Sequence, residues 1–290
     1  MVEQNHEFFN FAGMKQKVIL ITGASSGIGY DTAALLAKQG HKVYGAARRI
    51  DKMQPLKTLG VTPIMMDVTD EASMAAGVQA LLDAEGRIDV LVNNAGYGYL
   101  GAVENIAMEE ARKQLDVNVF GLARLTQLVL PVMRKQGSGR IVNVASIAGK
   151  MSFGFMGWYS VSKYAVEAFS DALRMEMRPF GVDVVIIEPG GIKTDWGIIA
   201  ANHLEESSKG TVYEGATTNE ANLLRYTYSS KLLSKPSVVA KAISKGVNRR
   251  RPRARYRTGM GSRSLVFFHW LIPTRWWDAI GRRLGKTQIL

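Results

Sequence analysis

Residues 17–29 read KVILITGASSGIG, an apolar β-branched run that leads directly into a glycine-rich turn. A helical pattern at 31–40 follows the turn, so the segment predicts a strand, a tight turn and a helix. Gly23, Gly27 and Gly29 let the backbone turn and approach a ligand without Cβ interference. The exposed helix N-terminus then offers amide donors to a pyrophosphate. The candidate nucleotide contacts in this turn are Gly23, Ser25, Ser26, Gly27, Ile28 and Gly29.

The same alternation of short apolar runs and longer helical patterns continues down the chain. Strands are expected at 17–22, 42–47, 62–66, 88–93, 140–145 and 182–188, and helices at 31–40, 71–86, 109–133 and 162–181. Strands that alternate with helices in this way predict an α/β fold, with a parallel sheet covered on both faces. The regular alternation stops near residue 190, and 195–235 reads as an irregular excursion with a short helix or two. A long loop of this kind is usually functional, so we expect a lid over a site, at about 191–235.

Composition narrows the chemistry. The 290 residues contain no cysteine, which excludes disulfides and thiolate metal sites. The four histidines are scattered without ligand spacing, so no metal site is expected. Residues 1–16 lack the pattern of a signal peptide, and the apolar tract LVFFHWLI at 265–272 is too short to span a bilayer. We therefore expect a soluble cytoplasmic protein.

The positive charge is concentrated at the C-terminal end. From Arg249 to Leu290 there are eleven basic residues and one acidic residue, which is +10 of the net +12. We expect an N-terminal extension at 1–16, a nucleotide-binding catalytic domain at 17–260, and a basic aromatic tail at 261–290. The tail has three interpretations: a lid whose aromatics close the pocket, an interfacial helix on anionic lipid, or nucleic-acid binding. The lid is favoured, weak peripheral membrane contact is second, and no motif supports nucleic acid.

Other candidate nucleotide contacts fall at the ends of predicted strands, where ligands bind in open α/β sheets. The second strand ends in AARR (46–49), which places Ala47 and Arg48 where a carboxylate would grip an unphosphorylated ribose. An arginine there suits a 2′-phosphate, so NADP(H) is favoured and NAD(H) is the alternative; Arg49 is assigned to a solvated turn. The remaining candidates are Asp67, Val68, Asn93, Ala95, Gly96, Pro189, Gly190, Ile192 and Thr194. Asn93 and Asn94 could instead merely satisfy backbone groups at a strand end.

Ser146 follows the predicted strand 140–145, and WYSVSKYAVEAF (158–169) then opens an apolar helix. Tyr159 and Lys163, four residues apart, lie one turn apart on the same helix face. The structural alternative is a snorkelling lysine whose stem covers a core tyrosine. Asn118 lies within the apolar helix at 109–133, where it either bonds neighbouring carbonyls or marks a kink that frees a carbonyl for water.

Taken together, TGASSGIG, NNAG, Asn118, Ser146, YSVSK and PGGIKT resemble the short-chain dehydrogenase/reductase superfamily. The resemblance runs from about Lys17 to Thr194. Together with RARYRTGMG and LIPTRWWDAIGRR, it is nearest to the branch of 17β-hydroxysteroid and retinol dehydrogenases. It implies a doubly wound Rossmann-type sheet with a seventh strand near 254–258.

The resemblance also implies a catalytic tetrad of Asn118, Ser146, Tyr159 and Lys163. Tyr159 would exchange a proton with the substrate oxygen, and Lys163 would lower the tyrosine pKa from about 10 and hold the nicotinamide ribose. Ser146 would hydrogen-bond the substrate oxygen, and Asn118 would hold a water linked to Lys163. Both Tyr159 and Lys163 would thus contact the cofactor.

Apolar and aromatic residues near the expected site favour a hydrophobic alcohol, ketone or aldehyde as substrate. Tyr97 and Phe153, with Ser146 and Tyr159, are the predicted substrate contacts. The leading hypothesis is an NADP(H)-dependent oxidoreductase; the alternatives are a nucleotide-binding sensor without turnover and an epimerase-type enzyme. The family usually pairs through its two long helices, so a homodimer or homotetramer is expected.

Overall fold

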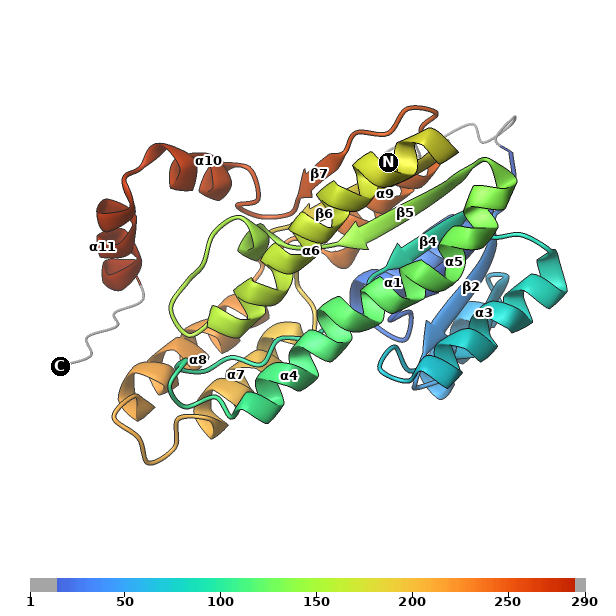
Figure 1. Ribbon diagram of the computed structural model, residues 1–290. Helices are drawn as coiled ribbons and strands as arrows, with labels where there is room; N and C mark the ends of the chain where they lie inside the picture. Colours follow the sequence, from blue (N-terminus) through green and yellow to red (C-terminus); the bar gives the residue numbers. More distant parts are fainter. Residues whose placement is uncertain (1–14, 285–290) are drawn as a thin grey trace, which may run out of the picture.

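The computed structural model describes residues 15–284, without the side chain of Leu284, and contains one seven-stranded parallel sheet (Figure 1). Its strand order is β3-β2-β1-β4-β5-β6-β7. The strands are β1 (Val18–Thr22), β2 (Lys42–Ala47), β3 (Val61–Met65), β4 (Val90–Asn93), β5 (Gly139–Val144), β6 (Val182–Pro189) and β7 (Arg255–Thr258). This confirms the predicted Rossmann-type architecture, including the seventh strand.

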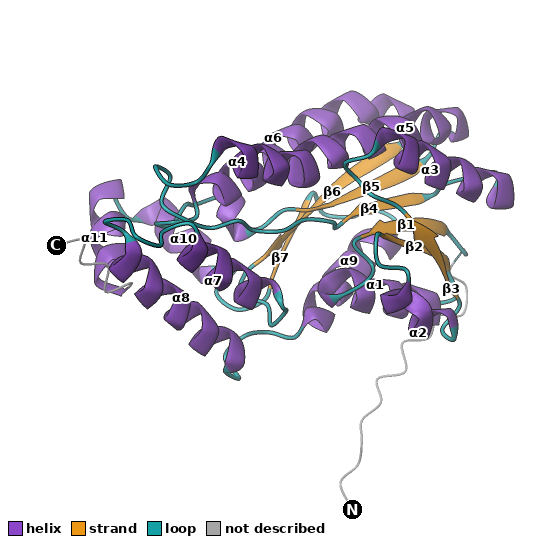
Figure 2. Cartoon of the chain, turned by 90° about the horizontal axis from the view of Figure 1, so that it is seen from below, coloured by secondary structure: helices purple, strands orange, loops and turns teal. Residues whose placement is uncertain are grey.

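Helices cover both faces of the sheet (Figure 2). They are α1 (Gly27–Lys38), α2 (Gln54–Lys57), α3 (Glu71–Glu85), α4 (Met108–Leu115), α5 (Leu122–Gln136), α6 (Gly157–Met177), α7 (Trp196–Glu206), α8 (Glu214–Ser229), α9 (Pro236–Asn248), α10 (Ser264–Leu271) and α11 (Thr274–Leu284). Helices α1, α2 and α9 lie on one face, and α3, α5 and α6 on the other.

The alternation of side chains along β1 explains why both faces are covered. Ile19 and Ile21 pack with α1 and α9, whereas Val18 and Leu20 pack with α3, α5 and α6. All four side chains are almost fully buried. Because successive strand residues point to opposite faces, an uninterrupted apolar strand requires a helical layer on each side.

Three parts of the chain differ from expectation. The segment 195–235 forms two substantial helices, α7 and α8, and α9 follows without having been predicted. The expected single helix at 109–133 extends to both sides and is interrupted between α4 and α5 by a π-helical segment, Asp116–Gly121. The expected N-terminal extension, residues 1–16, lies almost entirely outside the described residues.

The continuous helix Met108–Gln136 is the one described helix long and apolar enough to cross a membrane. Its buried Leu125, Val129 and Met133 pack against the sheet with β1 and β4 residues. Length and composition alone are weak evidence for a span, because the core helix of a soluble protein passes the same test.

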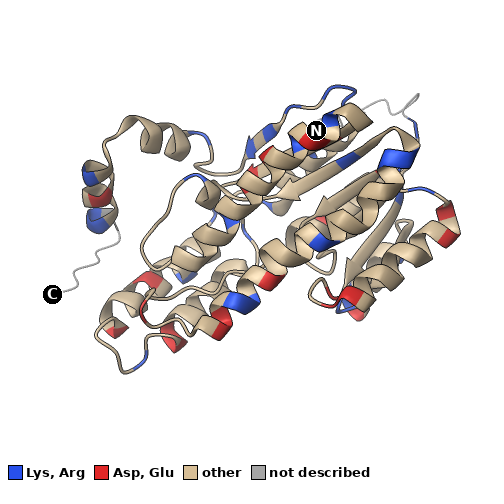
Figure 3. Cartoon of the chain, in the orientation of Figure 1, with Lys and Arg blue, Asp and Glu red and all other residues tan. Residues whose placement is uncertain are grey.

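The basic C-terminal region does not form one patch (Figure 3). Arg249 lies at the amino edge of the sheet, where its carbonyl accepts a hydrogen bond from Arg140. Arg255 and Arg257 are paired with carboxylates of β6 and α6. Arg250, Arg251 and Arg253 lie before β7, and Arg263 lies directly before α10. Helices α10 and α11 extend past the end of β7 (Figure 1), and α11 carries Arg275, Arg282 and Arg283.

Candidate active site

The glycine-rich turn between β1 and α1 has the backbone that its sequence predicts. Gly23 and Gly27 have φ of +67° and +54°, which side chains other than glycine rarely adopt. A Cβ on Gly29 would lie 2.3 Å from the Gly23 carbonyl oxygen. Gly23 and Gly27 are therefore needed for the backbone conformation of the turn, and Gly29 for the close approach of α1 to it. This leaves the start of α1 uncovered, as a phosphate-binding site requires.

Two arginines border this cradle at the end of β2. Arg48 lies with its Nη1 3.8 Å from Asp67 Oδ2, and its side chain is 75% exposed. Arg49, assigned from sequence to a solvated turn, donates instead from Nη2 to Ser25 Oγ at 3.4 Å. Arg49 thus lies against the glycine-rich turn, and Arg48 lies near the residues that follow β3.

Beyond β4, the two asparagines have separate roles. Asn94 donates from its side chain to the Thr22 carbonyl, and so ties this strand end to β1. Asn93 donates to Thr126 Oγ1 and to Asn143 Oδ1 in the buried core. Its side chain is therefore not available to a nucleotide, and a contact from Asn93 would have to come from its backbone.

Gly96 brings the same strand end to the predicted tetrad. A Cβ there would lie 3.0 Å from Asn118 Oδ1 and 3.6 Å from Lys163 Nζ. Only glycine leaves room at this point for a ligand to approach both side chains. The predicted roles of Asn118 and Lys163 therefore converge in space, although the two residues lie on different helices.

Asn118 occupies the π-helical segment between α4 and α5. Its Oδ1 accepts from the Tyr97 amide at 3.0 Å, and its Nδ2 donates to the Tyr97 carbonyl at 2.9 Å and to Ser162 Oγ at 3.0 Å. The structure contains features of both alternatives for Asn118: its side chain bonds a carbonyl, and the helix has a widened turn. π-helical turns of this kind recur at functional sites. Asn118 thereby fixes the Tyr97 backbone beside α6.

Lys163 and Tyr159 are both buried in α6. Lys163 Nζ lies 5.8 Å from the centroid of the Tyr159 ring and donates to the Val144 carbonyl at 3.0 Å. Burial lowers the Lys163 pKa to about 8 and raises the Tyr159 pKa to about 12. The raised tyrosine pKa is opposite to the expected lowering by Lys163, because burial disfavours the charged phenolate.

Ser146 lies at the end of β5, at the same edge of the sheet. Its Oγ accepts from the Ala148 amide at 3.1 Å and caps a short 3₁₀ turn, Ile147–Gly149. A hydrogen bond between Ser146 and Tyr159 lowers the tyrosine pKa, but by less than burial raises it. The serine therefore lies near the phenol, where the predicted tetrad places it.

The turn after β6 closes the other side of the cradle. A Cβ on Gly27 would lie 3.3 Å from Thr194 Cγ2, so the glycine-rich turn and this turn face each other. The Gly190 amide donates to the Thr258 carbonyl at 2.8 Å, and Ile192 is buried and bridges to Ser234. Pro189, the last residue of β6, thus begins a turn that is tied to β7 and to the segment before α9.

The family model for short chain dehydrogenases matches residues 17–202. The chain belongs to the short-chain dehydrogenase/reductase family. It is 37% identical over 266 residues to a probable short-chain type dehydrogenase/reductase, VdlC, of Helicobacter pylori, covering 91% of this chain and 96% of the relative. It is also 37% identical over 254 residues to the 3-ketodihydrosphingosine reductase of Bacteroides thetaiotaomicron, covering 85% and 89%.

Solved members of the family share the fold. A short-chain dehydrogenase from Streptomyces avermitilis has a TM-score of 0.76 and 32% identity, covering 94% of this chain and 98% of its own. A relative from Burkholderia phymatum was solved with NAD (27% identity, 81% and 86% coverage, TM-score 0.71). A serine dehydrogenase was solved with NADP+ (28% identity, 78% and 87% coverage, TM-score 0.68). Family members of this structure thus bind NAD or NADP. The predicted branch is supported loosely, by matches to vertebrate dehydrogenase/reductase SDR family member 7B.

In this family member an apolar cluster surrounds Tyr159. It contains Leu100, Ala148, Ala200, Ala201, Leu204 and Ala221, with Phe155, Met156, Trp196 and Leu224 packed against it. The Trp196 ring lies 5.1 Å from the Tyr159 ring. Most of the cluster comes from α7 and α8, the segment predicted to act as a lid.

The two predicted substrate contacts outside the tetrad are placed differently. Tyr97 is fixed by Asn118 at the site, whereas Phe153 is absent from the apolar cluster and packs 6.4 Å from Trp277 of α11. Sequence reasoning missed Tyr228 of α8, whose ring lies 6.1 Å from Trp196. Burial and the neighbouring Tyr159 raise the Tyr228 pKa. No local signal marks Tyr228, because only the fold of α8 brings it to the site.

Proposed function

We propose that this protein is an NADP(H)-dependent reductase of hydrophobic ketones or aldehydes, with Tyr159 as the proton donor. The observation that carries the proposal is the meeting of Tyr159, Lys163, Ser146 and Asn118 beside the glycine-rich cradle. These four groups come from three parts of the fold, namely α6, the π-helical segment and the end of β5. A purely structural role for the Tyr159–Lys163 pair would not explain their convergence.

The residues around the cradle fit a dinucleotide. The start of α1 and the glycines of its turn would hold the pyrophosphate, and Thr194 would contact the nicotinamide end from across the cradle. Arg48 and Arg49 would hold a ribose 2′-phosphate, which is why NADP(H) is preferred in this proposal. When bound, the nicotinamide ring supplies or accepts the hydride.

The raised pKa of Tyr159 keeps the phenol in the protonated form that a proton donor needs. With a pKa of about 12 the phenol keeps its proton at neutral pH and can donate it to a carbonyl oxygen that becomes an alkoxide. Ser146 would hydrogen-bond the same oxygen and stabilise its developing charge. In the oxidative direction Tyr159 would have to act as a base, which requires its pKa to fall.

Lys163 and Asn118 support the proton donor. A Lys163 pKa of about 8 leaves the ammonium mostly charged at neutral pH, where it would bind ribose hydroxyls and stabilise a phenolate. Asn118 positions the Tyr97 backbone and the start of the Tyr97–Leu100 segment, which borders the same space. In the proposal Asn118 also holds the water that returns a proton towards Lys163.

The apolar cluster around Tyr159 supports a hydrophobic substrate. Trp196, Phe155 and Leu224 offer no charged partner, so a sugar phosphate or a carboxylic acid would lose hydration there without compensation. The relative named 3-ketodihydrosphingosine reductase has a long-chain ketone in its name. We therefore extend the proposal to ketones carrying a long apolar chain.

The proposal is tested by following NADPH consumption, with NADH in parallel, over a panel of ketones and aldehydes of increasing chain length. We expect turnover that prefers NADPH and improves with chain length. An epimerase-type enzyme would convert its substrate without net consumption of cofactor. A sensor would bind NADPH tightly and reduce no member of the panel, and either result would contradict the proposal.

A further inference from the structure

Helices α10 and α11 expose an unusual amount of aromatic surface. Trp270 is 79% exposed, Trp276 70% and Phe267 53%; Phe268, Leu271 and Ile280 are also exposed. Only Trp277, Leu265 and Val266 connect the two helices to the body, through a small cluster with Ile147 and Met151. Most of these aromatics face outward and cover no part of the body, so the interpretation of the tail as a lid stays a prediction.

Helix α11 is sharply two-faced. Trp276, Trp277 and Ile280 fall on one side of the helix by their spacing, and Arg275 and Arg282 fall on the other. Trp277 leans onto Phe153 and onto His269 of α10, with ring separations of 6.4 Å and 5.1 Å. Trp276 and Ile280 project on the same side but have no such partner in an aromatic or core cluster among the described residues.

The arginines on and directly before these two helices are unpaired among the described residues. Arg263, Arg275, Arg282 and Arg283 form no ion pair within residues 15–284, and Asp278 is the one acidic residue between them. Arg255 and Arg257 are paired, whereas Arg249, Arg250, Arg251 and Arg253 lie before β7 and not on these helices. Exposed aromatics beside unpaired arginines are typical of a helix that lies in the interface of an anionic bilayer.

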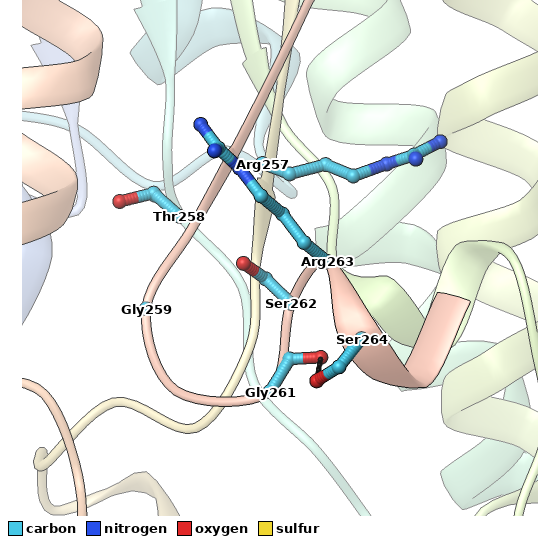
Figure 4. Close-up of a pocket in the computed structure, with 7 residues that line it drawn as sticks. All are labelled: Arg257, Thr258, Gly259, Gly261, Ser262, Arg263 and Ser264. Carbon is cyan, nitrogen blue, oxygen red and sulfur yellow. Dashed lines mark hydrogen bonds between the residues drawn. The ribbon is translucent and has the colours of Figure 1, made fainter. Parts of the chain in front are cut away.

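A pocket of about 410 Å³ opens immediately before α10 (Figure 4). It is lined by Arg257, Thr258, Gly259, Gly261, Ser262, Arg263 and Ser264. Ser262 is only 3% exposed, and its hydroxyl makes no hydrogen bond to any residue that the structure describes. Figure 4 shows this hydroxyl inside the curve of the turn, below the extended side chain of Arg263. A hydroxyl without a partner among the described residues, an arginine and a helix N-terminus together suit an oxyanion such as a phosphate group.

We propose that α10 and α11 form a docking surface for an anionic lipid bilayer, with a lipid phosphate held in the pocket at Ser262 and Arg263. The aromatic side chains enter the boundary between headgroups and acyl chains, and Arg275, Arg282 and Arg283 face the headgroups. We propose a bilayer as the partner of this surface, and not a second copy of this chain, because the surface is positively charged. A twofold contact through α11 would bring two sets of unpaired arginines together, whereas an anionic surface neutralises them.

The position of α11 means that docking would bring the active site close to the bilayer. Through Phe153, α11 contacts the loop that leads to Tyr159 at the start of α6. A substrate dissolved in the bilayer would then leave it next to the active site. This last step rests on the proposed function, whereas binding to lipid does not.

Flotation of the full-length protein with lipid vesicles tests the docking surface, and it needs no catalytic activity. We expect binding to phosphatidylcholine vesicles that contain phosphatidylglycerol, weakening as salt is added, and little binding to phosphatidylcholine alone. Arg263→Gln with Arg282→Gln should lower the affinity by roughly tenfold or more, at about 1 kcal/mol per arginine. Trp270→Ser with Trp276→Ser should lower it at least as far.

Matched controls separate this surface from general stickiness. Arg112→Gln with Arg178→Gln removes two exposed arginines elsewhere, and Met175→Ser with Phe180→Ser removes two exposed apolar side chains. Both controls should float like the wild type. The proposal fails if the wild type does not float, or if controls and tail variants lose binding equally. A change in solution mass in the tryptophan variant, without vesicle binding by the wild type, would identify a contact between copies instead.

Discussion

At the scale of single residues, Arg48 and Arg49 together border the ribose end of the cradle. Because a charge-assisted hydrogen bond contributes about 1.5–3 kcal/mol, Arg48→Gln should raise the NADPH KM by roughly tenfold to a hundredfold. The NADH KM should change little. Arg49→Gln, which removes the contact to Ser25, is the matched variant. Steady-state kinetics with both cofactors measure the changes in the two KM values. Equal changes in the NADPH KM and the NADH KM would show that Arg48 does not recognise the 2′-phosphate.

Lys163 shows that a functional side chain can cost stability. Its pKa falls from 10.5 to about 8 on burial, so the folded state holds fewer protons than the unfolded chain between these values. The free energy of unfolding therefore rises with pH across that window, and the cost is complete below pH 8. Lys163→Met should stabilise the protein at pH 7 by about 1–3 kcal/mol, after the loss of its bond to Val144, while it abolishes turnover.

Thermal unfolding of this variant between pH 7 and 10 measures the effect. The gain in Tm should shrink as the pH rises, because the wild-type lysine loses its charge. Lys113→Met, at an exposed position, is the control and should shift Tm little at any pH. A Lys163→Met variant that is less stable than the wild type at pH 7 would show that the ammonium stabilises the fold.

Some residue roles were readable from the sequence and others were not. Gly23, Gly27 and Tyr159–Lys163 were predictable because local spacing fixes their geometry. The inward turn of the Asn93 side chain was not, because it depends on Thr126 and Asn143 from other elements. For the same reason the tyrosine pKa was expected to fall: the charge of Lys163 is visible in the sequence, whereas the extent of burial is not.

At the scale of elements, the joint between β6 and β7 supports the cofactor turn. Glu188 is 0% exposed and binds Arg257 at 2.5 Å and Arg255 at 3.1 Å, directly before Pro189 and Gly190. Removing one member of a buried ion pair leaves its partners uncompensated. Since both arginines are partly exposed, we expect Glu188→Gln to destabilise the protein by roughly 2 kcal/mol and to weaken NADPH binding.

Denaturant unfolding and NADPH titration of Glu188→Gln measure the two effects. Asp183→Asn, on the same strand but half-exposed and paired with Arg140, is the control and should change both far less. If Glu188→Gln lost stability but bound NADPH normally, the ion pairs would hold β7 without positioning the turn.

How well each helix or strand could be predicted depended on how clearly its own sequence indicates its structure. Most of the strands carried short apolar runs, and all fall within one or two residues of the predicted bounds. Helices α7 and α8 were expected only as a helix or two in a loop, because their apolar residues pack on Tyr159 and Trp196 and not on the sheet. A Cβ on Gly197 would lie 2.2 Å from the Tyr228 ring, a contact between α7 and α8 that no local pattern reveals.

At the scale of the whole molecule, the long helices leave apolar side chains uncovered. Phe120, Val161 and Tyr164 are exposed on the π-helical segment and α6. We expect them to be covered in a homodimer or homotetramer, since apolar patches on family members of this shape need a partner. Light scattering should give a multiple of the chain mass, and Val161→Glu should lower it. A monomer mass for the wild type would contradict this expectation.

The central claim is that Tyr159 donates the proton in a reduction driven by NADPH. The most direct measurement compares wild type and Tyr159→Phe on the best ketone, with NADPH consumption and NADPH binding recorded on the same preparations. We predict that the variant binds NADPH as the wild type does but loses at least about 100-fold in kcat, the lower range for a general acid. Equal turnover in the two proteins would contradict the account.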